Sequence, residues 1–359
     1  MFRIHMLPAG DGDCFLVETG DAPHRILIDG GRSITAGPYL RAMLDSFPNR
    51  PGPKIDLMVL THIDADHIEG LLTLIPTMNK GDVGEFWFNG LKHVRVANGQ
   101  NAEVPTVIAA KPAERVLSIR QGFELTRMIE LLGWPWNSLL PKGVAMINAR
   151  GPLPAIPLPD GTITLLGPPQ AKLRAFAKEW EFWFRRLFKA APVLAAIRKP
   201  LTQISLAALA ASRDKPDTAK PNGTSITFVI EHKGKRALFC ADAHPGDLAE
   251  AVTRYGGIGR VYFDAVKVAH HGSAANNTST LIDRLASPLW LVSSDGSRHS
   301  HPDPEAIARI LLAPCRDKRL VFNYRSRFNG VWENPELADQ AAYRPIFPTG
   351  PGPTFVDLL

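Results

Sequence analysis

The stretch that decides the fold lies at residues 61–70 and reads THIDADHIEG. The apolar run before it predicts a buried strand over 54–62, and the apolar spacing after it predicts a helix over 67–78. Within it, six consecutive residues hold four side chains of metal-binding type: His62, Asp64, Asp66 and His67. Imidazole and carboxylate groups suit a borderline ion such as Zn²⁺, or a harder one such as Mn²⁺.

A sharp loop between strand and helix lets alternate side chains face two neighbouring metal positions. His62 and Asp64 then serve one position, and Asp66 and His67 serve the other. A solvated polar turn is the competing interpretation. The apolar strand before the loop and the amphipathic helix after it favour the metal site.

Two later segments carry further candidates. Asp242 ends the apolar run 237–241, where its carboxylate either bridges two cations or caps the helix that follows. His270 and His271 close the run 266–271. Alternate residues of a strand share a face, which favours His270 as a metal ligand and leaves His271 behind it or facing substrate. The opposite assignment stays open, as does a buried histidine pair without metal.

The composition predicts a folded cytoplasmic protein. The chain has 359 residues, of which 45% are hydrophobic and 21% charged, enough apolar material for a packed core. Cys14, Cys240 and Cys315 are far apart, which excludes a disulfide scaffold and fits a reducing compartment. We see no secretory leader and no apolar window of the roughly 18 residues that a membrane span needs.

Positive charge is concentrated in residues 170–220, which hold 11 Lys or Arg and 4 Asp or Glu in a chain of net charge +6. Such a segment attracts phosphate-bearing partners, or is simply a solvated helical face. Aromatic residues recur at helical spacing over 176–188. They predict a core-facing stripe on an inserted helical hairpin, or a face that stacks on nucleic acid or lies on a membrane.

The remaining sequence alternates strand-like and helix-like segments in two β-rich halves. This pattern predicts two sheets packed face to face with helices outside. We therefore divide the chain into an N-terminal half of the fold (1–169), a basic and aromatic helical insertion (170–220) and a C-terminal half (221–359).

Together these segments resemble the metallo-β-lactamase superfamily. They are most similar to the nuclease-type domain of the competence DNA-uptake channel ComEC and its stand-alone relatives. The resemblance covers most of the chain outside 170–220. It rests on six motifs in order: Gly12-Asp13, Leu27-Ile28-Asp29-Gly30-Gly31, His62-x-Asp64-x-Asp66-His67, Ala241-Asp242, His270-His271-Gly272-Ser273 and His301-Pro302.

The resemblance implies a four-layer αβ/βα sandwich with a helical insertion and two divalent metal ions at one edge of the sheets. Zn²⁺ is the first choice, with Mn²⁺ or Mg²⁺ as alternatives. Asp29 would support the metal loop. The implied ligands are those quoted above: His62, Asp64, Asp66, His67, Asp242 and His270.

Two departures bear on substrate and metal content. Asp64 stands where the superfamily's common loop has histidine, a change that the competence-type branch shares and that favours phosphodiesters over β-lactams. Many members carry another metal-binding histidine between the loop and the bridging aspartate. Here that interval holds only His93 and His232, neither in the expected setting, so we expect weak occupancy of the first metal position.

The implied activity is that of a metal-dependent phosphodiesterase or nuclease, with nucleic acid or a small phosphodiester as substrate. A hydroxide that bridges the metals would attack, and Asp66 would orient it while also binding metal. His271, Ser273 or His301 would contact the phosphate or protonate the leaving oxygen. The His301-Pro302 pair has a second interpretation, the opening of a helix.

Two other functions compete with this one. The first is a small-molecule hydrolase acting on an ester, a lactam or a phosphodiester in a pocket capped by 170–212. The second is a non-catalytic binding protein in which the metal site is structural or sensory.

Overall fold

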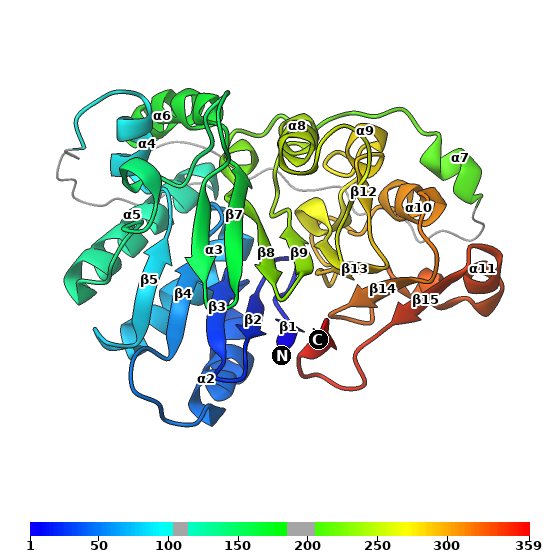
Figure 1. Ribbon diagram of the computed structural model, residues 1–359, viewed down its shortest axis with the longest axis horizontal. Helices are drawn as coiled ribbons and strands as arrows, with labels where there is room; N and C mark the ends of the chain where they lie inside the picture. Colours follow the sequence, from blue (N-terminus) through cyan, green and yellow to red (C-terminus); the bar gives the residue numbers. More distant parts are fainter. Residues whose placement is uncertain (103–113, 185–204) are drawn as a thin grey trace.

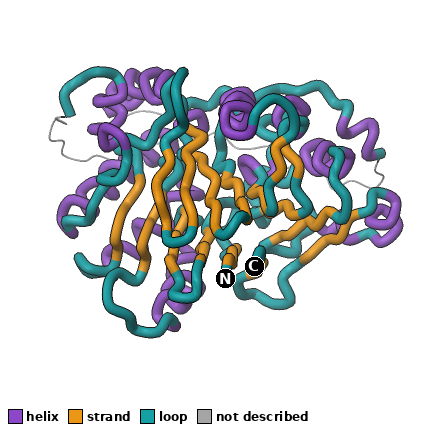
Figure 2. The backbone as a smooth tube through the Cα atoms, viewed as in Figure 1, coloured by secondary structure: helices purple, strands orange, loops and turns teal. Residues whose placement is uncertain are grey.

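The computed structural model describes residues 1–102, 114–184 and 205–359. In this part of the chain two large sheets pack face to face, and helices cover their outer sides (Figures 1 and 2). This is the α/β sandwich that the sequence predicts. Across the described residues, no helix combines the length and the apolar character that crossing a membrane requires.

The first sheet has six strands in the order β16-β1-β2-β3-β4-β5. Neighbours from β16 to β3 run antiparallel, whereas β3, β4 and β5 run parallel. Because β16 pairs with β1, the two chain ends lie close together (Figure 1). The strands are β1 (Phe2–Met6), β2 (Phe15–Thr19), β3 (His24–Ile28), β4 (Ile55–Val59), β5 (Val83–Trp87) and β16 (Thr354–Asp357).

The second sheet has eight strands in the order β15-β14-β13-β11-β9-β8-β7-β6. Strands from β9 to β15 run parallel, and those from β6 to β9 run antiparallel. They are β6 (Ala155–Leu158), β7 (Gly161–Gly167), β8 (Thr227–His232), β9 (Lys235–Phe239), β11 (Ala265–Lys267), β13 (Leu289–Val292), β14 (Lys318–Phe322) and β15 (Tyr343–Ile346), with β10 (Val261–Tyr262) and β12 (Leu285–Ala286) paired separately.

The helices lie around the sheets rather than between them (Figure 2). The α-helices are α1 (Ser33–Thr35), α2 (Ala42–Ser46), α3 (Ala65–Leu74), α4 (Leu91–Ala97), α5 (Glu114–Leu132), α6 (Gln170–Phe184), α7 (Leu206–Ala210), α8 (Pro245–Gly256), α9 (Ser279–Ile282), α10 (Pro304–Leu312) and α11 (Pro335–Gln340). Short π or 3₁₀ turns are η1 (Ala36–Arg41), η2 (Ile75–Thr77), η3 (Pro141–Gly143), η4 (Asn222–Thr224), η5 (Ala269–Gly272) and η6 (Gly330–Glu333).

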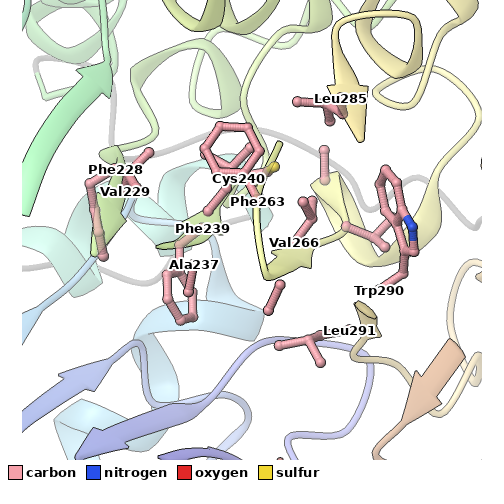
Figure 3. Close-up of a cluster of buried hydrophobic side chains, with 14 of the residues drawn as sticks. Phe228, Val229, Ala237, Phe239, Cys240, Phe263, Val266, Leu285, Trp290 and Leu291 are labelled. Atoms are coloured by element: carbon pink, nitrogen blue, oxygen red, sulfur yellow. The ribbon is translucent and has the colours of Figure 1, made fainter. Parts of the chain in front are cut away.

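Side-chain alternation in the strands builds two apolar cores. In β3, Ile26 and Ile28 face the core between the sheets, and Leu27 faces the core beneath the helices. Phe15 of the first sheet meets Phe239 of the second edge to face, with ring centroids 5.9 Å apart. Figure 3 shows part of the core that the second sheet contributes, around Phe228, Phe239 and Trp290.

Only the first part of the 170–220 segment can be compared with its predicted aromatic stripe. Phe176 and Trp180 are buried in the helix-side core, and α6 lies beside α4, where Gln170 donates a hydrogen bond to the Ala97 carbonyl. These two aromatic residues are therefore core packing. Residues 185–204 lie outside the described residues, and they include the rest of the stripe beyond Phe184.

The run 266–271 does not continue as a strand up to the histidine pair, so the expected extent of this strand is wrong. The strand structure before the pair is interrupted between β10 and β11, and β11 ends at Lys267. Residues 269–272 then turn, and His270 and His271 have φ angles of +45° and +54°. The period of two therefore stops before the histidine pair.

Two glycines let α3 lie directly on the turn after β3. The Gly70 N–H donates to the Gly31 carbonyl at 2.8 Å, and the Gly30 N–H donates to the His67 carbonyl at 2.8 Å. A Cβ added to Gly70 would lie 1.9 Å from the Gly30 oxygen. This close backbone approach fixes the helix that carries His67.

We expect Gly70→Ala to lower the free energy of unfolding by about 1–3 kcal/mol, because the methyl group forces the backbones apart. Urea denaturation measures this. The control is Gly81→Ala, whose added Cβ has no atom within 4 Å. Equal losses in the two variants would contradict the role of the close contact.

Candidate metal centre

The loop after β4 brings its four ligand-type side chains to the start of α3. His62 and His67 are buried, whereas Asp64 and Asp66 are partly exposed. Asp64 is the residue before the first helical turn, and Asp66 and His67 lie within that turn. The loop therefore contributes two buried imidazoles and two carboxylates that are partly open to solvent.

Asp29 holds this loop in place from the end of β3. Its carboxylate accepts hydrogen bonds from the Thr61 N–H at 2.7 Å, the Thr61 hydroxyl at 2.8 Å and His67 Nδ1 at 2.8 Å. Asp29 is buried and has a φ of +57°. It is thus in contact with the metal loop, as the resemblance implied for a supporting residue.

Asp242 is the centre of the cluster. It is buried, follows β9, and reaches the loop from the second sheet. Its Oδ2 atom lies near the Nε2 atoms of four histidines, at 3.7 Å from His62, 3.4 Å from His67, 3.4 Å from His270 and 3.6 Å from His271.

Each of these imidazoles is oriented through its other nitrogen. His62 Nδ1 lies 3.1 Å from the Thr61 hydroxyl oxygen, and His67 Nδ1 donates to Asp29. His270 Nδ1 lies 2.8 Å from the Asn276 side-chain oxygen, and His271 Nδ1 lies 3.0 Å from the Ser293 carbonyl oxygen. Since every Nδ1 faces an oxygen acceptor, every Nε2 is left for the cluster. Such partners fix the tautomer of metal-binding histidines.

The two loop carboxylates divide the cluster into two groups. Asp64 Oδ2 lies 3.7 Å from His62 Nε2, and His270 is near enough to both for its charge to affect their pKa values. Asp66 Oδ2 lies 3.3 Å from His271 Nε2 and 3.9 Å from His67 Nε2. We name these sets the first group (His62, Asp64, His270) and the second group (Asp66, His67, His271), with Asp242 shared.

Burial shapes the charge of the cluster. Burial, helped by the charge of His67, lowers the pKa of His62 to about 3, so this imidazole is neutral at pH 7. Partial burial and the neighbouring Asp66 raise the pKa of Asp64 to about 7. Burial lowers the pKa of His271, but Asp13 and Asp242 outweigh it and raise that pKa to about 10. The carboxylates thus draw positive charge into the site.

The donor set fits divalent cations. Nε2 of His62, His67 and His271 and Oδ1 of Asp242 are buried and have no hydrogen-bond partner. Unpaired buried polar atoms are costly, and cations bound in the two groups would satisfy all four. Imidazole nitrogen with carboxylate oxygen is a ligand set typical of Zn²⁺.

His301 lies beside the cluster rather than within the set around Asp242. Its ring centroid is 5.7 Å from that of His270, and its Nδ1 is 3.4 Å from Asp303 Oδ1. The exposed His299 stacks on it with centroids 5.8 Å apart. These two imidazoles form a rim next to the first group.

Sequence reasoning gave no role to Asp13, Lys267, Asp217 or Asn276. Asp13 and Lys267 are both buried and form an ion pair behind His271. Asn276 donates to Asp217 at 3.0 Å, and both face His270 Nδ1. Two signals were available: Gly12-Asp13 is one of the motifs that carry the resemblance, and Lys267 is a charged residue between two valines of an apolar run.

A scan of protein-family models and a search of curated proteins found no match to this chain. The chain is similar to several solved structures. Zn²⁺-bound PqqB from Methylobacterium extorquens is 14% identical, with 99% of this chain and 100% of that one covered and a TM-score of 0.41. The metallo-β-lactamase-fold protein YhfI from Bacillus subtilis is 12% identical, with 99% of this chain and 100% of that one covered and a TM-score of 0.37. The short form of human tRNase Z is also 12% identical, with 99% of each chain covered and a TM-score of 0.39.

We expect Zn²⁺ or Mn²⁺ to raise the melting temperature of chelator-treated protein. A ligand that binds only the folded state adds about 2.7 kcal/mol to the free energy of unfolding when its free concentration is about 100 times its Kd. Differential scanning calorimetry measures the shift. His67→Ala should reduce the shift strongly, and His24→Ala, outside the cluster, should keep it. A shift of equal size in both variants would place the bound metal elsewhere.

Proposed function

We propose that this protein is a metal-dependent phosphodiesterase or nuclease whose two divalent cations share Asp242. One observation carries the proposal: four imidazole Nε2 atoms from two distant motifs lie 3.4–3.7 Å from a single buried carboxylate oxygen. A shared carboxylate between two ligand groups is the arrangement that a two-metal hydrolase needs.

In this proposal the first group and Asp242 hold one cation, and the second group and Asp242 hold the other. Both His270 and His271 then serve as ligands, one for each cation. His270 takes the place of the histidine that the interval between the loop and Asp242 lacks. The mixed nitrogen and oxygen ligands favour Zn²⁺, with Mn²⁺ as the alternative.

Divalent cations bound there would polarise a phosphoryl oxygen and lower the pKa of an attacking water. The side chains of the chain do the rest. Asp66 is partly exposed at the rim, where its second oxygen can orient the water. His301, beside the first group, can contact the phosphate or protonate the leaving oxygen.

Positive charge near the cluster favours an anionic phosphodiester as the substrate. Arg298 carries a positive charge in the loop that leads to the rim histidines His299 and His301. Burial lowers the pKa of both histidines, so they offer hydrogen bonds rather than charge. The basic segment 170–220 adds positive charge to the same chain. The resemblance to the competence-type branch points to the same substrate class. Three free cysteines among the described residues agree with the proposed cytoplasmic location.

We expect the Zn²⁺- or Mn²⁺-loaded protein to hydrolyse bis-p-nitrophenyl phosphate or single-stranded DNA, and not a β-lactam. Asp66→Ala should lower kcat/KM by at least about 100-fold. Removing the hydrogen-bond partner of a metal ligand already costs about 10–100-fold, and removing a ligand itself should cost more. The matched control is Asp21→Ala at an exposed carboxylate. Full activity of a folded, metal-stripped Asp66→Ala protein would refute the mechanism, and turnover of the lactam alone would refute the substrate class.

A nuclease should also bind single-stranded DNA through its phosphates. Its affinity should then fall with salt, with a slope of log K against log salt of about −0.7 per phosphate contact. Fluorescence anisotropy of a labelled oligonucleotide in Ca²⁺ buffer measures this. Absence of binding at low salt would remove nucleic acid as the substrate and leave the small phosphodiester.

A further inference from the structure

A buried ion pair lies directly behind the second group. Lys267 of β11 and Asp13 of the β1–β2 turn are each 2% exposed, and the ammonium contacts Asp13 Oδ2. Burial disfavours both charges, but the pair itself offsets this. The pKa of Lys267 stays raised, and that of Asp13 is lowered to about 2. Because a buried pair is costly compared with apolar packing, its presence calls for a specific role.

Asp13 connects this pair to both motifs of the cluster. Its Oδ1 lies 3.2 Å from His271 Nδ1, and its backbone N–H donates to the Asp66 carbonyl at 3.3 Å. A Cβ on the preceding Gly12 would lie 1.8 Å from the Asp66 oxygen, so this turn touches the metal loop directly. Lys267 therefore orients Asp13, and Asp13 contacts the ring that faces Asp66.

The two groups differ in what stands behind their histidines. In the second group each Nδ1 lies within 3.2 Å of a carboxylate oxygen: His67 bonds Asp29 at 2.8 Å, and His271 lies 3.2 Å from Asp13 as well as 3.0 Å from the Ser293 carbonyl oxygen. In the first group His62 Nδ1 faces a hydroxyl, and His270 Nδ1 faces the Asn276 amide oxygen at 2.8 Å, with the Asp217 carboxylate farther away at 3.7 Å. A carboxylate behind an imidazole raises its basicity and its affinity for metal.

We propose that the buried Lys267–Asp13 pair positions His271 and makes the second group the tighter of the two cation positions, so that the cations bind in sequence. This inference rests on the proposed two-cation function. Asp13 lies close enough to His67, Asp242 and His271 to join them around one ion. However, its two oxygens already face Lys267 and His271 Nδ1, which makes it a positioning residue rather than a ligand.

The test is a Co²⁺ titration of the metal-stripped full chain, followed by visible absorption and equilibrium dialysis. Wild-type protein should bind two equivalents, the first at least about 10-fold tighter than the second. The variant Asp13→Asn/Lys267→Met removes both charges together, which avoids leaving either one buried alone. Its first equivalent should bind about 10–100-fold more weakly, with the second unchanged.

The absorption bands separate positioning from coordination. The double variant should keep the band positions and intensities of saturated wild-type protein, because the ligands are the same. Altered bands would make Asp13 a ligand and overturn the inference. Wild-type affinity for both equivalents would reduce the pair to a structural role and overturn it as well, while leaving the proposed function intact.

The matched control is Asp217→Asn, whose carboxylate lies 3.7 Å from His270 Nδ1 behind the first group. It should weaken the second equivalent only. Weakening of the first equivalent would reverse the assignment of the two groups. Wild-type protein that binds no Co²⁺, Zn²⁺ or Mn²⁺ would instead refute the proposed function itself.

Discussion

The carboxylate of Asp242 lies buried among four imidazole rings, and this contact depends on both halves of the chain. His62 and His67 come from the first sheet, and Asp242, His270 and His271 come from the second. The apolar core between the sheets sets the distance between these groups, as the contact of Phe15 with Phe239 illustrates. The geometry of the site therefore depends on the packing of the core between the sheets.

The same cluster is a local cost to the fold. It gathers carboxylates and imidazoles where solvent cannot stabilise them, and several of their inward-facing atoms lack hydrogen bonds. The surrounding structure holds the rings by their Nδ1 atoms, through Asp29, Thr61, Asn276 and Ser293. A site that is arranged before its cation arrives needs little reorganisation to bind it.

Much of this was predictable from the sequence, because residue type and position at strand ends carry it. The loop 61–67 and Asp242 could be recognised as ligand-type residues, and the alternation of strand-like and helix-like segments in two β-rich halves predicted the confirmed sandwich. The roles of His270 and His271 could not be predicted, because the chain leaves the strand at Lys267 and both histidines adopt positive φ. The pairing of Asp13 with Lys267 joins segments too distant for any local pattern.

The pairing of β16 with β1 makes the last strand of the chain part of the first sheet. The chain that builds the second sheet therefore returns to complete the first one. If the chain were divided between its two β-rich halves, the N-terminal piece would display the bare hydrogen-bonding edge of β1. Such an edge is a template for strands of other molecules, so the separated piece would be prone to aggregate.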